Sequence, residues 1–293
     1  MIRQLTAELL SPVGAQLGEG PSWDPVRHMW CWVDITSRAV YLSDESGTTL
    51  ARWSTPQDVG AALPARDGFL LASRDGFDFL AEDGTVRPVC AVQPDRPDIR
   101  FNDAKCDPRG RAFAGTMAYD ETPGEAMLVR LDPGPNARPV LTGLTLGNGL
   151  GWSPDGRRMH FIDSPTHQVT QFEYDVDAGE IGARVGAVEI AKDQGMPDGM
   201  CVDDTGAIWV ALWGGSAVHR YTPDGELDTV VAVPTRHVTS VAFGGPGAST
   251  LLITTARFGL GEAVLAEEPD AGGLFVLEPG VTGPAATPWT PIS

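Results

Sequence analysis

The sequence predicts an all-β protein, and specifically a single six-bladed β-propeller domain that spans residues 1–293. Tight-turn signals recur roughly every 40 to 50 residues, which is the period of propeller blades. A similar pair of short β-rich segments follows each turn, and no amphipathic helix longer than two turns is apparent. No linker or change in composition marks the boundary that two β domains or a β-sandwich would favour.

Six turns carry the repeat. In each of them Gly supplies a positive φ, or Asp or Pro begins the turn. They are Trp23-Asp24-Pro25, Ala65-Arg66-Asp67-Gly68, Asp107-Pro108-Arg109-Gly110, Ser153-Pro154-Asp155-Gly156, Asp203-Asp204-Thr205-Gly206 and Gly244-Gly245-Pro246-Gly247. Their even spacing predicts six repeated units.

Each turn is followed by β-rich segments. The first segments are 29–33, 69–72, 112–115, 159–162, 208–212 and 251–254, and the second are 39–42, 77–80, 127–131, 169–174, 218–221 and 274–277. A further short segment often follows, as at 86–89 and 230–233. Six units of about four antiparallel strands are therefore expected. Segment 5–10 is expected to complete the last blade, which closes the ring and protects the sheet edges.

Composition excludes several classes of function. The net charge is −18 and no basic patch is visible, which argues against a nucleic-acid partner. No segment approaches the roughly 18 apolar residues of a membrane span, and the N-terminus lacks the apolar core of a signal peptide. We therefore expect a cytoplasmic protein without a membrane or an obligate protein partner. Its four cysteines lack C-x-x-C spacing and are expected to be small buried residues.

A set of polar residues recurs five positions before the turns, counted from Asp24 in the first turn. The set contains Glu19, Gly60, Asn102, Asn148, Asp198 and Thr239. In a propeller the strand that leads into this turn lines the central channel, so equivalent positions lie at one depth around one axis. Two carboxylates and two amides are thus expected to converge, with Gly60 leaving room beside them.

This convergence favours a metal on the central axis. Two carboxylates in a narrow channel repel each other and lose hydration unless a cation lies between them. Carboxylate and amide oxygens suit Ca²⁺, Mg²⁺ or Mn²⁺, and Zn²⁺ and Fe²⁺ also accept them. Three or four protein ligands would leave positions open for water and substrate, as in catalytic metal sites. The register alone is equally compatible with polar channel residues bridged by water.

At these same residues the sequence resembles the gluconolactonase/regucalcin (senescence marker protein) family. The resemblance runs nearly end to end, through segments 17–23, 32–35, 100–108, 115–117, 148–153, 197–203 and 255–257. Among them are Gly18-Glu19-Gly20-Pro21, Arg100-Phe101-Asn102-Asp103, Asn148-Gly149-Leu150-Gly151-Trp152 and Pro197-Asp198-Gly199-Met200. The family implies a six-bladed propeller, one divalent metal and hydrolysis of sugar lactones. Its metal ligands fall on Glu19, Asn148 and Asp198.

The resemblance also implies where substrate binds. The family's substrate contacts fall on Arg100 and Asn102, and Asn102 can instead be a direct or water-mediated metal ligand. The family places an acid shortly after Gly-Thr-Met, and here that spacing falls on Asp120, with Glu121 beside it. Tyr119 precedes them, which departs from the family pattern. Trp213 is expected near the mouth of the pocket, either covering a sugar ring or packing at a strand end.

The predicted function is metal-dependent hydrolysis of an aldonolactone, such as glucono-, xylono- or arabinonolactone, to the free sugar acid. Asp198 is the expected catalytic residue, because it lies at the metal and can guide or accept a water proton. A phosphotriesterase-like metal hydrolase on the same scaffold is one alternative, although Arg100 and Asn102 favour a hydroxylated substrate. A non-catalytic calcium-binding propeller is another. A serine hydrolase is disfavoured, since no G-x-S-x-G motif occurs.

Overall fold

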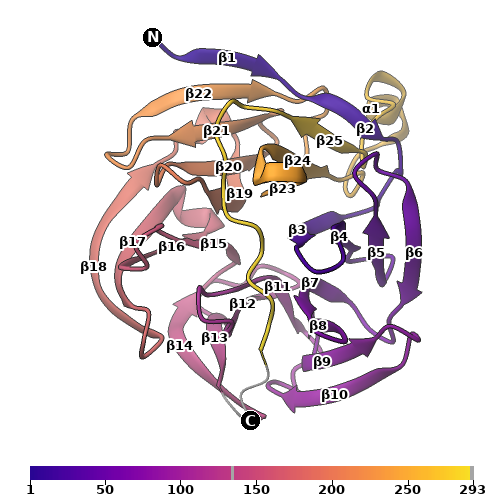
Figure 1. The fold of residues 1–293 in the computed structure, drawn as a ribbon, viewed down its shortest axis with the longest axis vertical. Helices are drawn as coiled ribbons and strands as arrows, with labels where there is room; N and C mark the ends of the chain where they lie inside the picture. Colours follow the sequence, from indigo (N-terminus) through magenta and orange to yellow (C-terminus); the bar gives the residue numbers. More distant parts are fainter. Residues whose placement is uncertain (133–134, 291–293) are drawn as a thin grey trace.

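The computed structural model describes residues 1–132 and 135–290, and over these residues the chain forms six sheets arranged as blades around a central axis (Figure 1). Each blade has four antiparallel strands in sequence order from the axis outward, except that a strand from the N-terminus completes the last blade. The first strands of neighbouring blades contact one another and so line the channel. The predicted six-bladed propeller is confirmed.

The first three blades occupy the first half of the chain. The first contains β3 (Gly18–Asp24), β4 (Met29–Asp34), β5 (Ala39–Ser43) and β6 (Thr49–Ser54). The second contains β7 (Val59–Ala65), β8 (Gly68–Ser73), β9 (Gly76–Ala81) and β10 (Val86–Ala91). The third contains β11 (Ile99–Cys106), β12 (Ala112–Ala118), β13 (Ala126–Asp132) and β14 (Asn136–Leu144).

The other three blades follow in the same manner. The fourth contains β15 (Gly147–Trp152), β16 (Arg158–Asp163), β17 (Gln168–Asp175) and β18 (Glu180–Glu189). The fifth contains β19 (Met196–Val202), β20 (Ile208–Trp213), β21 (Ala217–Tyr221) and β22 (Leu227–Ala232). The sixth contains β23 (Val238–Gly244), β24 (Thr250–Thr255) and β25 (Leu274–Leu277). The short helix α1 (Glu262–Glu267) lies between β24 and β25.

The N-terminal segment closes the ring differently from the prediction for 5–10. Only β2 (Glu8–Ser11) pairs with β25 and completes the sixth blade. The preceding strand β1 (Arg3–Thr6) instead pairs in parallel with β22 on the outer edge of the fifth blade. Between them the buried Ala7 donates its backbone N–H to Ala232 O at 2.9 Å. The segment therefore covers the outer edges of two blades. This leaves fewer unpaired backbone groups than adding the whole segment to one blade would.

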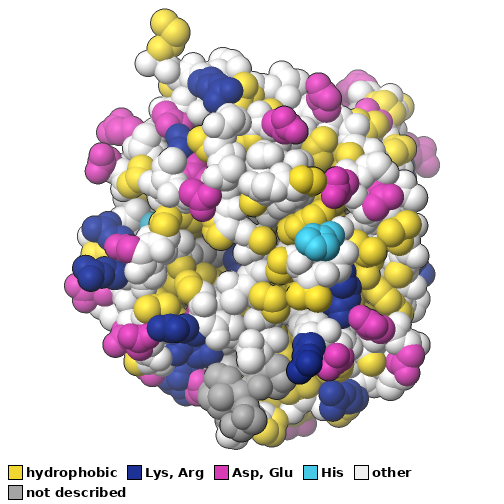
Figure 2. All heavy atoms as spheres, viewed as in Figure 1, with side chains coloured by type: hydrophobic (Ala, Val, Ile, Leu, Met, Phe, Trp, Pro, Cys, Tyr) yellow, Lys and Arg dark blue, Asp and Glu magenta, His cyan; other side chains and the backbone are white. Residues whose placement is uncertain are grey.

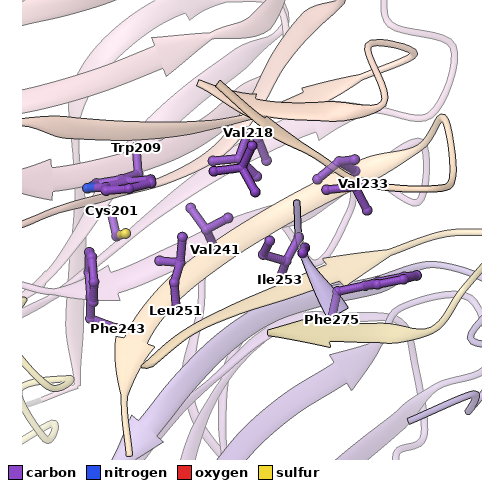
Figure 3. Close-up of a cluster of buried hydrophobic side chains, with 13 residues drawn as sticks. Cys201, Trp209, Val218, Val233, Val241, Phe243, Leu251, Ile253 and Phe275 are labelled. Carbon is purple, nitrogen blue, oxygen red and sulfur yellow. The ribbon is translucent and has the colours of Figure 1, made fainter. Parts of the chain in front are cut away.

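The core is divided among the gaps between blades. Within the described residues, each of the six hydrophobic clusters joins side chains from two neighbouring blades. Figure 3 shows the cluster between the fifth and sixth blades, where Trp209, Phe243 and Phe275 pack with Val218 and Ile253. Both faces of an inner strand meet a neighbour, so strands such as β7 and β23 are buried along their whole length. Cys31, Cys106 and Cys201 are buried as predicted, whereas Cys90 is partly exposed.

The two ends of the channel differ. The C-terminal segment crosses the end of the channel at which the inner strands finish (Figure 1). There the backbone N–H of Trp289 donates to Pro64 O at 2.7 Å. A cavity of about 290 Å³ lies beneath this segment, lined by residues such as Trp23, Asp103 and Ala285. On this face charged side chains gather toward the rim (Figure 2). The predicted metal ligands lie near the starts of the inner strands, toward the other face. None of the described helices has the length and apolar character needed to cross a membrane.

Candidate functional site

All six positions of the polar set coincide with irregularities in strand pairing. The register between each inner strand and its neighbour shifts at 19–22, 59–61, 101–104, 147–150, 197–200 and 238–240. A β-bulge adds one residue to a strand and re-aims the side chains beside it. The bulge therefore recurs in every blade at the depth where the predicted site residues lie. The sequence predicts these positions but not the bulge.

Glycine follows each of the three predicted metal ligands, and the packing of inner strands explains two of these glycines. A Cβ at Gly149 would lie 2.7 Å from the backbone oxygen of Asp198, and one at Gly199 would lie 2.0 Å from Ser240 Oγ. Gly20 has a φ of +53°, which disfavours a side chain. At these three bulges glycine permits the close approach of neighbouring blades.

The polar side chains are buried together in the channel. Glu19, Asn102, Asn148 and Asp198 are between 4% and 7% exposed. Burial raises the pKa of Glu19 well above its usual value, and the charges of Asp198 and Asp103 raise it further. Burial and the charge of Asp103 likewise raise the pKa of Asp198. The protein alone therefore does not stabilise the ionised form of either carboxylate, and a cation would do so.

Asn148 provides the test of whether these residues fit a metal. Its Nδ2 donates to Ser164 Oγ at 3.0 Å, whereas its Oδ1 is buried without a hydrogen-bond partner among the described residues. An unsatisfied buried acceptor costs about 1–3 kcal/mol. No group of three or more His, Cys, Asp or Glu side chains suited to a metal occurs in the described part of the chain, so an ion held by Glu19 and Asp198 would need an amide oxygen as its third protein ligand. Two carboxylates and one free amide oxygen fit a divalent ion.

Arg100 and Asn102 lie beside this group and are held together. Arg100 Nη1 donates to Asn102 Oδ1 at 2.7 Å and to Phe101 O at 3.0 Å. Asn102 Nδ2 donates to Gly147 O at 3.2 Å. The oxygen of Asn102 is thus already used by Arg100, which favours a contact with substrate over direct metal ligation. Arg100 Nε and Nη2 form no hydrogen bond with the described residues and are available to a ligand.

The acid expected after Gly-Thr-Met makes a local contact in its own turn. Asp120 is exposed, and its Oδ1 accepts from Thr122 Oγ1 at 2.8 Å and from Thr122 N at 3.1 Å. Glu121 is exposed as well, with a φ of +55°. No hydrogen bond or ion pair among the described residues joins either carboxylate to the central group. A role for Asp120 in binding substrate and a place for Glu121 in the pocket stay predictions.

Tyr119 lies beside Arg100, and the sequence predicts no role for it. Its ring centroid lies 5.8 Å from the Arg100 guanidinium carbon, and its hydroxyl donates to Asp58 Oδ2 at 2.5 Å. Burial and then the Asp58 carboxylate raise the pKa of Tyr119 to about 12. The departure from the family pattern at this position was the only signal in the sequence.

Trp213 lies at the end of β20, opposite Met196 at the start of β19, and thus at the same end of the fifth blade as Asp198. Its ring stacks on His237, with centroids 3.8 Å apart and planes at 13°. His237 Nδ1 lies 3.1 Å from Phe258 O. One face of the indole is therefore already covered, and only the other could meet a sugar ring.

The fold and the site together define a β-propeller in which buried carboxylate and amide groups and an arginine converge on the axis. Comparison with known proteins agrees: residues 17–257 match the family model described as "SMP-30/Gluconolactonase/LRE-like region". The chain belongs to this family.

Three relatives illustrate the similarity. The pentonolactonase XacC of Haloferax volcanii is 38% identical over 286 residues, which cover 95% of this chain and 96% of that protein. Regucalcin of Danio rerio is 36% identical over 266 residues, covering 89% and 90%. The crystal structure of regucalcin from Agrobacterium tumefaciens, described as a calcium-binding protein, superposes with a TM-score of 0.92 at 27% identity and covers 99% of both chains.

Proposed function

We propose that this protein is a lactonase that hydrolyses a sugar-derived lactone to the free sugar acid, with one divalent ion held by Glu19, Asn148 and Asp198. The unpaired Oδ1 of Asn148, buried with two carboxylates of raised pKa, is the observation that carries the proposal. Relatives named as a pentonolactonase and a sugar lactone lactonase support the reaction class. Oxygen ligands accept Ca²⁺, Zn²⁺, Mn²⁺, Mg²⁺ or Fe²⁺, so the identity of the ion is left to experiment.

A bound divalent ion supplies Lewis acidity, which favours the negative charge that develops on a lactone carbonyl during attack by water. The protein's own residues do the rest. Arg100 has donors left for an oxygen of the substrate, and its planar guanidinium fixes their direction. Asn102 holds Arg100 in place at 2.7 Å. Asp198, as the catalytic residue, orients the attacking water and accepts its proton before that proton passes to the leaving alkoxide.

Two other functions are open to the same scaffold. A phosphotriesterase-like hydrolase would use the same ion on a phosphorus centre, but the buried Arg100–Asn102 pair suits a hydroxylated substrate better. A non-catalytic calcium-binding propeller finds support in the description of the Agrobacterium relative. It does not account for an arginine that keeps free donors beside the metal ligands.

The experiment is metal removal and replacement. The purified protein is stripped with a chelator, single ions are added back, and acid release is followed on aldonolactones and, in parallel, on an organophosphate triester. The proposal expects ion-dependent acid release from lactones that is lost in Asp198→Ala. Turnover of the triester alone would support the phosphotriesterase reading. Tight Ca²⁺ binding without any turnover would support the binding protein. Wild-type kcat in metal-loaded Asp198→Ala would refute the role of Asp198.

A further inference from the structure

Tyr119 closes the outer side of Arg100. The tyrosine follows β12, and its backbone N–H donates to Asp98 O at 2.9 Å, which anchors it to the start of β11. The guanidinium carbon lies 5.8 Å from its ring centroid, within the roughly 6 Å reach of a cation–π contact, and this spacing is too narrow for a substrate group to lie between the two. Arg100 is accordingly only 7% exposed, although it lies near the channel mouth.

The ring is held in place by neighbouring blades. Its hydroxyl donates to Asp58 Oδ2 at 2.5 Å, and Arg38 Nε donates to Asp58 Oδ1 at 3.0 Å. Arg38 comes from the first blade, Asp58 from the segment before the second, and Tyr119 from the third. This chain of contacts spans three blades, and it gives the ring a defined position on the wall of the site.

The same contacts remove hydroxyl acceptors from this side. Both oxygens of Asp58 are engaged, one by Arg38 and the other by Tyr119. The carboxylate of Asp120 accepts from Thr122. A sugar chain that extended past Arg100 would therefore meet the carbon face of the phenol ring, whose position is fixed by Asp58.

We propose that Tyr119 is a specificity-determining residue that restricts the site to short lactones, namely five-carbon aldonolactones, over their six-carbon homologues. The proposal rests on the lactonase function proposed above. The excluded element is the one extra CHOH group that a six-carbon 1,4-lactone carries outside its ring. The exclusion is a matter of the position of the ring, so it acts mainly on KM and kcat/KM.

The experiment compares matched substrates. The first pair is L-arabinono-1,4-lactone and D-galactono-1,4-lactone, and the second is D-xylono-1,4-lactone and D-glucono-1,4-lactone. The two members of each pair share the stereochemistry of the lactone ring and differ by that CHOH group. Metal-loaded wild type, Tyr119→Ala, Tyr119→Ser and Tyr119→Phe are assayed on each pair. Tyr41→Phe is the matched control, because Tyr41 also lies against an arginine, Arg52, at 5.6 Å and accepts its hydrogen bond at 3.1 Å, but on the outer strands of the first blade.

We expect wild type to favour the five-carbon member at least tenfold in kcat/KM. Tyr119→Ala and Tyr119→Ser should raise the six-carbon to five-carbon ratio at least tenfold, chiefly through a lower KM for the longer lactone. Tyr119→Phe keeps the ring, so its six-carbon to five-carbon ratio should lie between that of these two variants and that of wild type. The ratio of Tyr41→Phe should match that of wild type. A merely structural role for Tyr119 would lower kcat/KM for both substrates together without changing their ratio.

Two results would overturn the inference alone: a wild type that prefers the six-carbon lactones, or a ratio unchanged within twofold in Tyr119→Ala and Tyr119→Ser that still turn over lactone. Absence of turnover of every lactone by metal-loaded wild type would instead refute the proposed function. Thermal unfolding and calorimetric metal titration of each variant establish that fold and metal binding are intact. Because both Tyr119→Ala and Tyr119→Ser remove the ring, the test still stands if one of them fails to fold.

Discussion

Asn148 donates its side-chain amide to Ser164 Oγ at 3.0 Å, and this bond decides which way the amide group faces. With Nδ2 committed, Oδ1 is left buried and without a partner among the described residues. Ser164 begins a 3₁₀ turn after β16, and its own N–H donates to Leu146 O at 3.1 Å, so the acceptor is itself anchored. The fourth blade thus holds a carbonyl oxygen ready for an ion.

Ser164→Ala should weaken divalent-ion binding by roughly tenfold, because partners that orient a metal ligand typically contribute 10- to 100-fold. Calorimetric titration of the chelator-stripped protein measures the effect. Ser43→Ala is the control, since buried Ser43 accepts from Trp32 Nε1 at 3.2 Å in the first blade, away from the channel. An unchanged affinity in Ser164→Ala would argue that the amide is not a ligand.

Asp198→Asn should be more stable than wild type in the presence of chelator and less stable with saturating ion. Burial and neighbouring charge raise the pKa of both Asp198 and Glu19, so removing one charge relieves repulsion in the metal-free protein. With the free ion at about a hundredfold of its Kd, the free energy of unfolding of wild type should rise by about 2.7 kcal/mol, a gain that the variant lacks. Thermal unfolding with and without ion tests this crossover. Equal Tm values for wild type in both conditions would contradict a metal site.

The stability of the protein should fall between about pH 6.5 and pH 4 because of His160. Burial, and secondarily Arg158, lower the pKa of this histidine from 6.5 to about 4. The folded state then binds fewer protons than the unfolded state, so protonation favours unfolding as pH falls through this window. The full effect is about 3 kcal/mol.

His160→Gln should therefore flatten the pH dependence of the free energy of unfolding, measured by urea titration at pH 7, 5 and 4 in chelator. His28→Gln, at an exposed turn, should leave it unchanged. A slope in His160→Gln equal to that of wild type would show that other groups control acid stability.

Asp203→Ala should destabilise the protein by about 3 kcal/mol, because it leaves buried donors without a partner. The fully buried carboxylate accepts from Trp209 Nε1 at 3.0 Å, from Arg220 Nε at 2.8 Å and from the backbone of the following turn. Asp155 lies within the corresponding turn of the fourth blade, accepts from Arg157 N and is exposed, so Asp155→Ala should cost less than about 1 kcal/mol. Denaturant unfolding compares the two, and equal losses would count against the role of burial.

Sequence alone was enough to locate the inner strand of each blade and the depth of the site within it. The turns made this possible, because a tight turn sets the register of the strand that leads into it, and the same five-residue step then applies in every blade. This step gave Glu19, Asn102, Asn148 and Asp198, from which the family resemblance selected Glu19, Asn148 and Asp198 as metal ligands, and all four are buried.

Contacts between blades were decided only by the tertiary structure. The N-terminal segment divides between two sheets because two edges compete for it, and local β propensity does not distinguish them. Asp120 had the expected spacing, yet Tyr119 lies against Arg100, because Asp58 of a neighbouring blade holds the tyrosine and Thr122 holds the aspartate. The position of Tyr119 depends on a partner that is 61 residues away in the sequence and becomes its neighbour only when the blades assemble.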